Sequence, residues 1–187
     1  MRLVRLLAFG ATVLALTGCS SLIAPPYSPE YRALDQLKQQ PIGKVAVGPV
    51  QPTDTAAAVN RISLRASSLV SPKGTFSRYL EDALIQDLTE ISAYDPNSGL
   101  RIDATLRRND IDIGGFSTGT GQMDVDFTIS RGATVILKKS YQASTRFDSS
   151  FAGAVAIPKG QLEYANLVRS LLSQVYADPD FINALRK

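Results

Sequence analysis

The sequence predicts an α+β fold, a two-layer sandwich in which an antiparallel or mixed sheet of about five strands is covered on one face by two long amphipathic helices. Apolar and polar side chains alternate along much of residues 100–147, which is the period of a strand. In residues 76–91 and 162–175 apolar side chains recur instead at spacings of three and four, which is the period of a helix. Two such helices need an apolar surface to cover, and a meander of strands supplies it.

Two shorter strands are expected ahead of the first long helix, over residues 44–50 and 61–70, where β-branched and small residues recur. Pro49 indicates a strand end or a sheet edge, because proline has no N–H to donate to a neighbouring strand. The helix that follows is expected to be capped by Thr75 and to end near Ala93.

The strand that begins at Leu100 changes its buried face along its length. Ile102 and Leu106 share one parity, whereas Ile111 and Ile113 fall on the other. A strand keeps the same face buried only if an extra residue is inserted where the parity changes. We therefore predict a β-bulge or bend within residues 107–110.

Residues 114–121 are rich in glycine and could be considered as a phosphate-binding loop. They lack the Gly-Lys-Ser/Thr ending of such loops, and the pattern after them is that of a strand and not of a helix. We interpret them as a hairpin turn with Phe116 at its tip, a candidate contact for a partner. The next strand should turn tightly at residues 130–132 into a last strand that ends near Phe147.

Residues 149–158 are small and apolar and follow neither period. They are either a connection tucked beneath the last helix or a partly exposed loop that docks a partner or touches lipid, as exposed apolar patches often do. The second hypothesis makes Phe151, Val155 and Ile157 candidate contacts, together with Phe116. A long helix should follow from Lys159, with Leu162, Ala165, Val168, Leu171, Leu172 and Val175 along its apolar side.

A short terminal helix is expected after the long one. Asp178 can cap it, and Pro179 suits its first position. Its apolar positions would be Phe181, Ile182 and Leu185.

The composition argues against catalysis. The chain has no histidine and one cysteine, Cys19, so histidine-dependent triads and the common zinc and iron sites are excluded. We expect no enzyme activity, no cofactor and no metal. One cluster of four aspartates could in principle bind calcium, but arginines nearby favour a solvated, locally paired face. This group consists of Asp110, Asp112, Asp124 and Asp126.

The first residues have the layout of a secretory signal, with Arg2 and Arg5 ahead of an apolar run that extends to Leu16. The run is too short to span a bilayer comfortably, since spanning takes about 20 apolar residues. It ends in Leu16, Thr17, Gly18 and Cys19.

These four residues resemble the lipobox of bacterial lipoproteins. The resemblance implies that Leu16, Thr17 and Gly18 are recognised by the signal peptidase, which cleaves before Cys19. It also implies that Cys19 carries a diacylglycerol thioether and an acylated amino group. The residue after Cys19 is Ser20 and not an aspartate, which in this family implies export to the outer membrane, with the domain facing the periplasm.

Three segments are expected: a signal peptide over residues 1–18, a lipidated tether over 19–43 and a single periplasmic domain over 44–187. The tether contains prolines and a short helical pattern over 28–37. Removal of residues 1–18 lowers Lys plus Arg from 20 to 18 against 17 acidic residues. Such a balance does not favour nucleic acid as a partner, because phosphate binding needs clustered basic residues.

The order of elements resembles that of several small envelope lipoproteins of Gram-negative bacteria. These serve lipopolysaccharide assembly, the activation of penicillin-binding proteins, or lipid-transport ABC systems. The expected function is that of a non-catalytic accessory protein, with the membrane and another envelope protein as partners. The alternative is a carrier module that binds lipid or glycan, for which an apolar groove between sheet and helices is expected.

Overall fold

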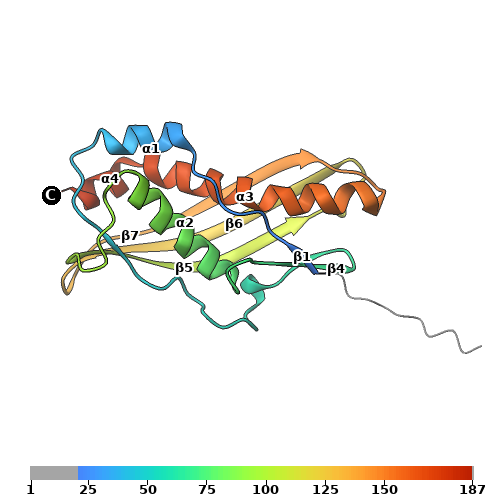
Figure 1. Ribbon diagram of the computed structural model, residues 1–187, viewed down its shortest axis with the longest axis horizontal. Coiled ribbons are helices and arrows are strands. Elements are labelled where there is room, and N and C mark those ends of the chain that lie inside the picture. Colours follow the sequence, from blue (N-terminus) through green and yellow to red (C-terminus); the bar gives the residue numbers. More distant parts are fainter. Residues whose placement is uncertain (1–20, 187) are drawn as a thin grey trace, which may run out of the picture.

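The computed structural model describes residues 21–186, and the predicted signal peptide and Cys19 lie outside these residues. Helices and strands alternate along the chain in an order that groups the three longest strands together (Figure 1). The elements are β1 (Ser21–Ile23), α1 (Tyr31–Lys38), β2 (Ala46–Val47), the short 3-10 helix η1 (Ala58–Asn60), β3 (Ile62–Leu64), β4 (Ser67–Val70), α2 (Phe76–Glu90), β5 (Leu100–Asp112), β6 (Thr118–Arg131), β7 (Thr134–Asp148), α3 (Gly153–Ala177) and α4 (Pro179–Leu185).

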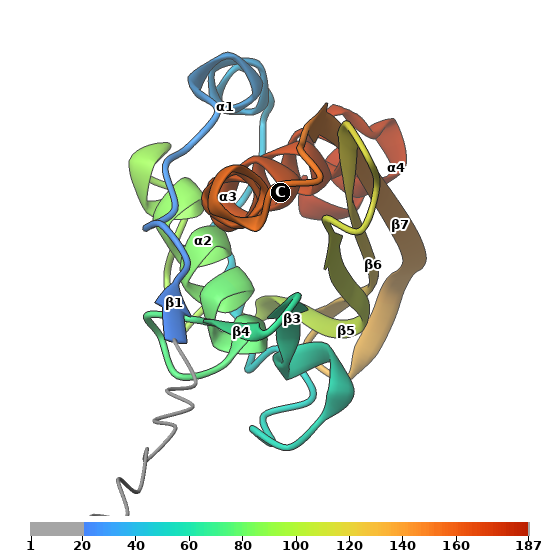
Figure 2. The same cartoon turned by 90° about the vertical axis from the view of Figure 1, so that its right-hand side faces the viewer.

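The main sheet has four strands in the order β2-β5-β6-β7, in which β5, β6 and β7 form an antiparallel meander and β2 runs parallel to β5. Helices α2 and α3 lie against one face of this sheet (Figure 2). The predicted α+β sandwich is therefore confirmed. Its strands divide differently, because β1, β4 and β3 form a separate three-stranded sheet beside the main one.

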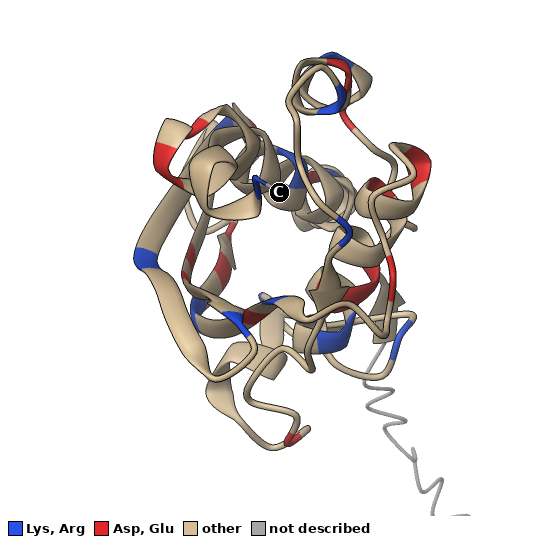
Figure 3. Cartoon of the chain, turned by 90° about the vertical axis from the view of Figure 1, so that its left-hand side faces the viewer, with Lys and Arg blue, Asp and Glu red and all other residues tan. Residues whose placement is uncertain are grey.

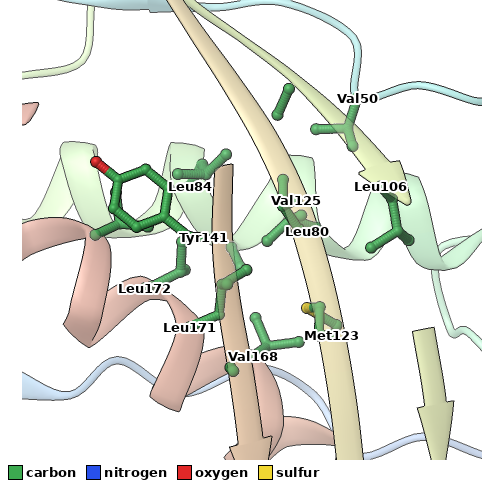
Figure 4. Packing of buried hydrophobic residues seen from close by; sticks show 14 of the residues in the cluster. Val50, Leu80, Leu84, Leu106, Met123, Val125, Tyr141, Val168, Leu171 and Leu172 are labelled. Carbon is green, nitrogen blue, oxygen red and sulfur yellow. The ribbon is translucent and has the colours of Figure 1, made fainter. Parts of the chain in front are cut away.

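The core fills the space between the main sheet and the two long helices (Figure 4). Phe127 on β6 is fully buried, with its ring centroid 5.6 Å from that of Tyr141 and 6.0 Å from that of Phe181. The alternation predicted for this strand is confirmed, because every second side chain points toward the helices. The side chains seen in Figure 4 include Leu80 and Leu84 of α2, Met123 and Val125 of β6, and Val168, Leu171 and Leu172 of α3.

The predicted β-bulge is present in β5. The pairing of β5 with β6 shifts register between Leu106 and Arg108, so that Arg107 is the extra residue. Ile102 and Leu106 before the shift and Ile111 and Ile113 after it are all buried. The inserted residue thus restores the buried face, as the change of parity required.

Residues 61–70 form a tight hairpin of β3 and β4 and not the predicted single strand. The chain reverses at Arg65, whose φ of 58° lies in the left-handed region. Ala66 is consequently exposed, although the strand pattern placed it beside Ile62 and Leu64. No glycine or asparagine marks this turn in the sequence, which explains why the alternation looked continuous.

Two predicted helix caps are confirmed. The Oγ1 of Thr75 accepts a hydrogen bond of 3.0 Å from the backbone N–H of Arg78 at the start of α2. At the start of α4, Oδ1 of Asp178 accepts one of 3.1 Å from Asp180, with Pro179 in the first helical position. Helix α2 ends at Glu90, close to the predicted Ala93.

Helix α3 begins earlier than predicted, at Gly153, and contains Pro158. Proline has no backbone N–H, so the carbonyl of Ala154 lacks its usual partner within the helix. Because Ala154 is exposed, water can donate a hydrogen bond to this carbonyl instead. The expected apolar side of the helix is buried except for Leu162, whose side chain is 61% exposed. Residues 153–158 are therefore the helical start of α3 and not the aperiodic connection that the sequence indicated.

Residues 21–43, assigned by the sequence to a tether, pack onto the domain. Strand β1 pairs in parallel with β4, and Leu34 and Leu37 of α1 are buried in the common core. The hydroxyl of Tyr79 on α2 donates a 2.8 Å hydrogen bond to the carbonyl of Pro25. Helix α1 starts at Tyr31, later than the helical pattern over 28–37 indicated.

Candidate functional site

Two phenylalanines lie exposed and side by side at one end of the molecule. Phe116 is in the turn between β5 and β6 and Phe151 is in the turn between β7 and α3, and they are 81% and 72% exposed. Their ring centroids are 6.0 Å apart. Phe76, Phe127 and Phe181 are instead fully buried. The structure thus brings together two candidate contacts that are 35 residues apart in the sequence.

The other two candidates from the sequence differ from each other. Val155, in the first turn of α3, is 45% exposed and belongs to the same end of the molecule. Ile157 is half-buried and packs against the core. Residues two apart on a helix point in nearly opposite directions, so the two side chains cannot share one exposed surface. We use the name aromatic end for Phe116, Phe151 and Val155.

The β5–β6 turn has a defined shape. The carboxylate of Asp112 accepts a 2.7 Å hydrogen bond from the backbone N–H of Gly114. A side chain at position 115 would place its Cβ 2.2 Å from the carbonyl oxygen of Thr118, so that Gly115 alone fits this close approach. The two turns are joined by a 2.8 Å hydrogen bond from the N–H of Ser149 to the carbonyl of Ser117.

Arg65, in the β3–β4 turn, links the β5–β6 turn to the β7–α3 turn. Its guanidinium donates hydrogen bonds to the carbonyls of Phe151 (2.7 Å), Ser150 (3.0 Å) and Ile113 (3.3 Å). Three turns from distant parts of the chain thus meet at one cation. The exposed rings are therefore carried on loops with fixed backbone positions.

The chain enters the described structure at this same end. Ser21 pairs with Ser68, three residues beyond Arg65. The side chain of Gln161 on α3 donates a 2.7 Å hydrogen bond to the carbonyl of Ile23. Strand β1, the β5–β6 turn and the start of α3 accordingly lie in the same half of the elongated molecule (Figure 1), with β1 on the other side from the β5–β6 turn when this end is seen face on (Figure 2).

The four aspartates weighed as a calcium site do not converge. They lie along one sheet face, but Asp110 is opposite Gln122 and Asp124 is opposite Arg108. Hydrogen bonds from Ser140 and Arg107 lower the pKa of Asp126. Among residues 21–186 no group of three or more potential ligands is placed to hold a metal. Acidic and basic residues are interspersed around the molecule in the same way (Figure 3).

A buried carboxylate lies outside the set of residues that the sequence singles out. Asp87 on α2 is 1% exposed, and its Oδ2 accepts hydrogen bonds from the hydroxyls of Tyr27 (2.8 Å) and Tyr176 (2.9 Å). Burial raises the pKa of Asp87 to about 6, although the two tyrosine hydrogen bonds act in the opposite direction. The group joins the N-terminal segment, α2 and α3. Its signal was an acidic residue on the apolar face of a helix, in line with Leu80 and Leu84.

A cavity of about 310 Å³ lies between the N-terminal segment, the β4–α2 loop and α2. At its rim Lys73 forms an ion pair of 3.1 Å with Asp82. This is not the groove between sheet and helices that the carrier hypothesis needs, because packed side chains fill that space (Figure 4). The cavity is lined by Pro26, Tyr27, Pro72, Tyr79, Ala83 and Ile85, among others.

No helix among residues 21–186 has the length and apolar character needed to span a membrane. The sequence matches no family model and no curated protein. Its fold is similar to that of a crystal structure from Xanthomonas campestris assigned to the family DUF330. That match has a TM-score of 0.57 and 10% identity, and it covers 84% of this chain and 95% of the other.

Two further solved structures match less well. One, described as a candidate lipoprotein from Caulobacter crescentus, has a TM-score of 0.46 and 11% identity, with 83% of this chain and 96% of that chain covered. The other, a hypothetical protein from Chlamydia trachomatis, has a TM-score of 0.44 and 12% identity, with 76% and 99% covered. At such low identity the likeness to the Xanthomonas protein is one of fold.

Proposed function

We propose that this chain is a lipid-anchored lipoprotein of the bacterial outer membrane, where it acts as a non-catalytic accessory component of an envelope protein machine. The observation that carries the proposal is that the chain joins the folded domain immediately after the lipobox-like residues. Ser21 is two residues from Cys19 and already pairs with Ser68 of the folded domain. An acylated Cys19 would therefore hold the domain close to the membrane.

The described side chains support a binding role over a catalytic one. Asp87 and Glu81, both buried on α2, contact groups that hold the fold together: Asp87 bonds two tyrosines, and Glu81 accepts a 3.2 Å hydrogen bond from the backbone N–H of Val50. With no histidine in the chain, the usual general base at neutral pH is missing. Stabilising or positioning another protein requires a surface and no reactive group.

The long strand β7 supplies such a surface. Its 15 residues pair with β6 along one edge, and among the described strands no other pairs with it. An extended segment of a partner protein could add to this edge, because unpaired backbone groups bind a further strand directly. Lys138 and Arg146 on β7 would guard the edge against unspecific pairing, as charged residues often do on edge strands.

Membrane anchoring is tested by fractionation of Cys19→Ala. We expect this variant to lose its outer-membrane association, because the thioether cannot form without the sulfur. The matched control is Ser20→Ala, which leaves the cysteine intact and should fractionate like the unmodified chain. Retention of Cys19→Ala in the outer membrane would contradict the proposed anchor.

The protein partner is tested by photo-crosslinking in cells. A photoreactive residue at Gln142, exposed on β7, should give one discrete adduct with an envelope protein. The matched control is Gln36, exposed on α1. If Gln142 and its neighbours on β7 gave no adduct, or if Gln36 gave the same one, the β7 edge would not be the binding surface.

A further inference from the structure

We propose that the aromatic end contacts the bilayer surface beside the lipid anchor, so that Phe116 and Phe151 insert into the membrane interface as a second point of attachment. This inference rests on the proposed function, because it takes Cys19 to be acylated. It goes further by assigning a lipid surface, and not a protein, to this end of the molecule.

The first argument is the short path from the anchor to the aromatic end. Strand β1 runs parallel to β4, so that its first residue, Ser21, lies near the start of β4 and the Arg65 turn. Two residues of chain span at most about 7 Å, which keeps Cys19 close to Ser21. Arg65 in turn bonds the carbonyl of Phe151. Any membrane that holds the lipid of Cys19 is therefore within reach of this end of the molecule.

The second argument is the exposure of the side chains concerned. Phe116 and Phe151 are the two most exposed large apolar residues in the described chain. Other exposed large apolar residues in this half of the molecule are Ile23, two residues after Ser21, and Val155 and Leu162 on the first half of α3. Exposed apolar groups in the same half of the molecule as a lipid attachment point suit insertion at the level of the headgroups.

The third argument is that the rings are held ready for contact. Arg65 and the bond between Ser149 and Ser117 fix the two turns that carry them. Insertion then requires little ordering of the loops, which removes one cost of binding. The charges near this end balance, because the exposed Arg65 and Lys159 are matched by two aspartates, so the apolar side chains and not the charge carry the contact. Asp112 and Asp148 are the acidic residues beside the two turns, and Asp112 is engaged with Gly114.

The chain contains no tryptophan, so one introduced indole reports its own surroundings. The test uses the full acylated chain with Phe151→Trp, reconstituted in vesicles of phosphatidylethanolamine and phosphatidylglycerol with brominated acyl chains. If the aromatic end inserts, bromine should quench the fluorescence about twofold or more relative to vesicles without bromine. Phe116→Trp should behave in the same way.

The matched control is Ile136→Trp. Ile136 is also an exposed apolar residue, but it lies near the β6–β7 turn, at the other end of the 14-residue strand β6. Such a strand is about 45 Å long, so an indole at this position should remain unquenched when the other end contacts the bilayer.

Flotation of the vesicles separates the two proposals. A full chain that does not float with vesicles would contradict the lipid anchor and thus the proposed function. A chain that floats, but in which Phe151→Trp and Phe116→Trp are no more quenched than Ile136→Trp, would overturn the membrane-contacting aromatic end and leave the anchor intact. Selective quenching of both variants supports it.

Discussion

Asp87 is expected to make the folded protein more stable at about pH 5 than at about pH 7.5. Burial raises its pKa from 3.8 to about 6 in the folded chain. The folded state then binds a proton more tightly than the unfolded state does. Stability from this group is therefore fully present below pH 3.8 and is lost as the pH rises through about 6.

The magnitude follows from the shift of roughly two pKa units. One unit corresponds to about 1.36 kcal/mol, so the full effect is about 3 kcal/mol. About 1.4 kcal/mol of it falls between pH 7.5 and pH 5. The pKa values of Asp126 and Asp178 are lowered from 3.8 in the folded chain. The stability that these two groups contribute is therefore lost only as the pH falls below 3.8, which is outside this window.

The assay is urea denaturation followed by far-UV circular dichroism at both pH values, for the unmodified chain and for Asp87→Asn. The neutral amide cannot titrate, so the variant should lose most of the gain on acidification. The reasoning is refuted if the unmodified chain is equally stable at both pH values, or if Asp87→Asn keeps the same pH dependence.

Three further predictions concern the core, a helix cap and the aspartate face. Phe127→Ala should lower the free energy of unfolding by about 3–5 kcal/mol, because a ring packed between Tyr141 and Phe181 leaves a cavity; a loss below 1 kcal/mol in urea denaturation would speak against this packing. Thr75→Ala should cost about 1 kcal/mol through loss of the α2 cap, with Thr75→Ser as a control that retains it. Addition of calcium should leave the melting temperature unchanged, since Asp124 faces Arg108 and Asp126 is paired with Arg107; a rise in melting temperature would show that the face binds the cation.

The sequence predicted well those features that depend on neighbours along the chain. The meander, the long helices and the caps at Thr75 and Asp178 each have a local period or a local hydrogen bond as their cause. The bulge at Arg107 was predictable for the same reason, because the buried face must remain the same across it. Leu162 is an exception, since its helical spacing is right but its side chain is left largely uncovered by the rest of residues 21–186.

The errors arose where a distant contact decides the local conformation. The turn at Arg65 has no turn residues of its own, and the guanidinium that it presents is held by carbonyls of residues 113, 150 and 151. The first turn of α3, at residues 153–158, lies close to the same contacts. Residues 21–43 looked like a tether because their prolines break any period, yet β1 finds its partner in β4.

The candidate site divides in the same way. Loop composition was sufficient to name Phe116 and Phe151 as candidate contacts, but it could not show that their rings lie 6.0 Å apart. It also could not show that Val155 is exposed whereas Ile157 packs against the core, because that requires knowing that both residues are helical. The Asp87 group was missed because its two tyrosines come from residues 27 and 176.

By itself, the sequence determined the two long helices, the three-stranded meander with its buried face and the short motif that predicts an anchor at Cys19. These follow from periodicity and from short motifs, which are properties of adjacent residues. Only the tertiary structure decided that the N-terminal segment lies on the domain, that Asp87 is buried with two tyrosines, and that two exposed phenylalanines meet at one end. The physical reason is that each of these depends on contacts between residues far apart in the chain, and such contacts leave no period in the sequence.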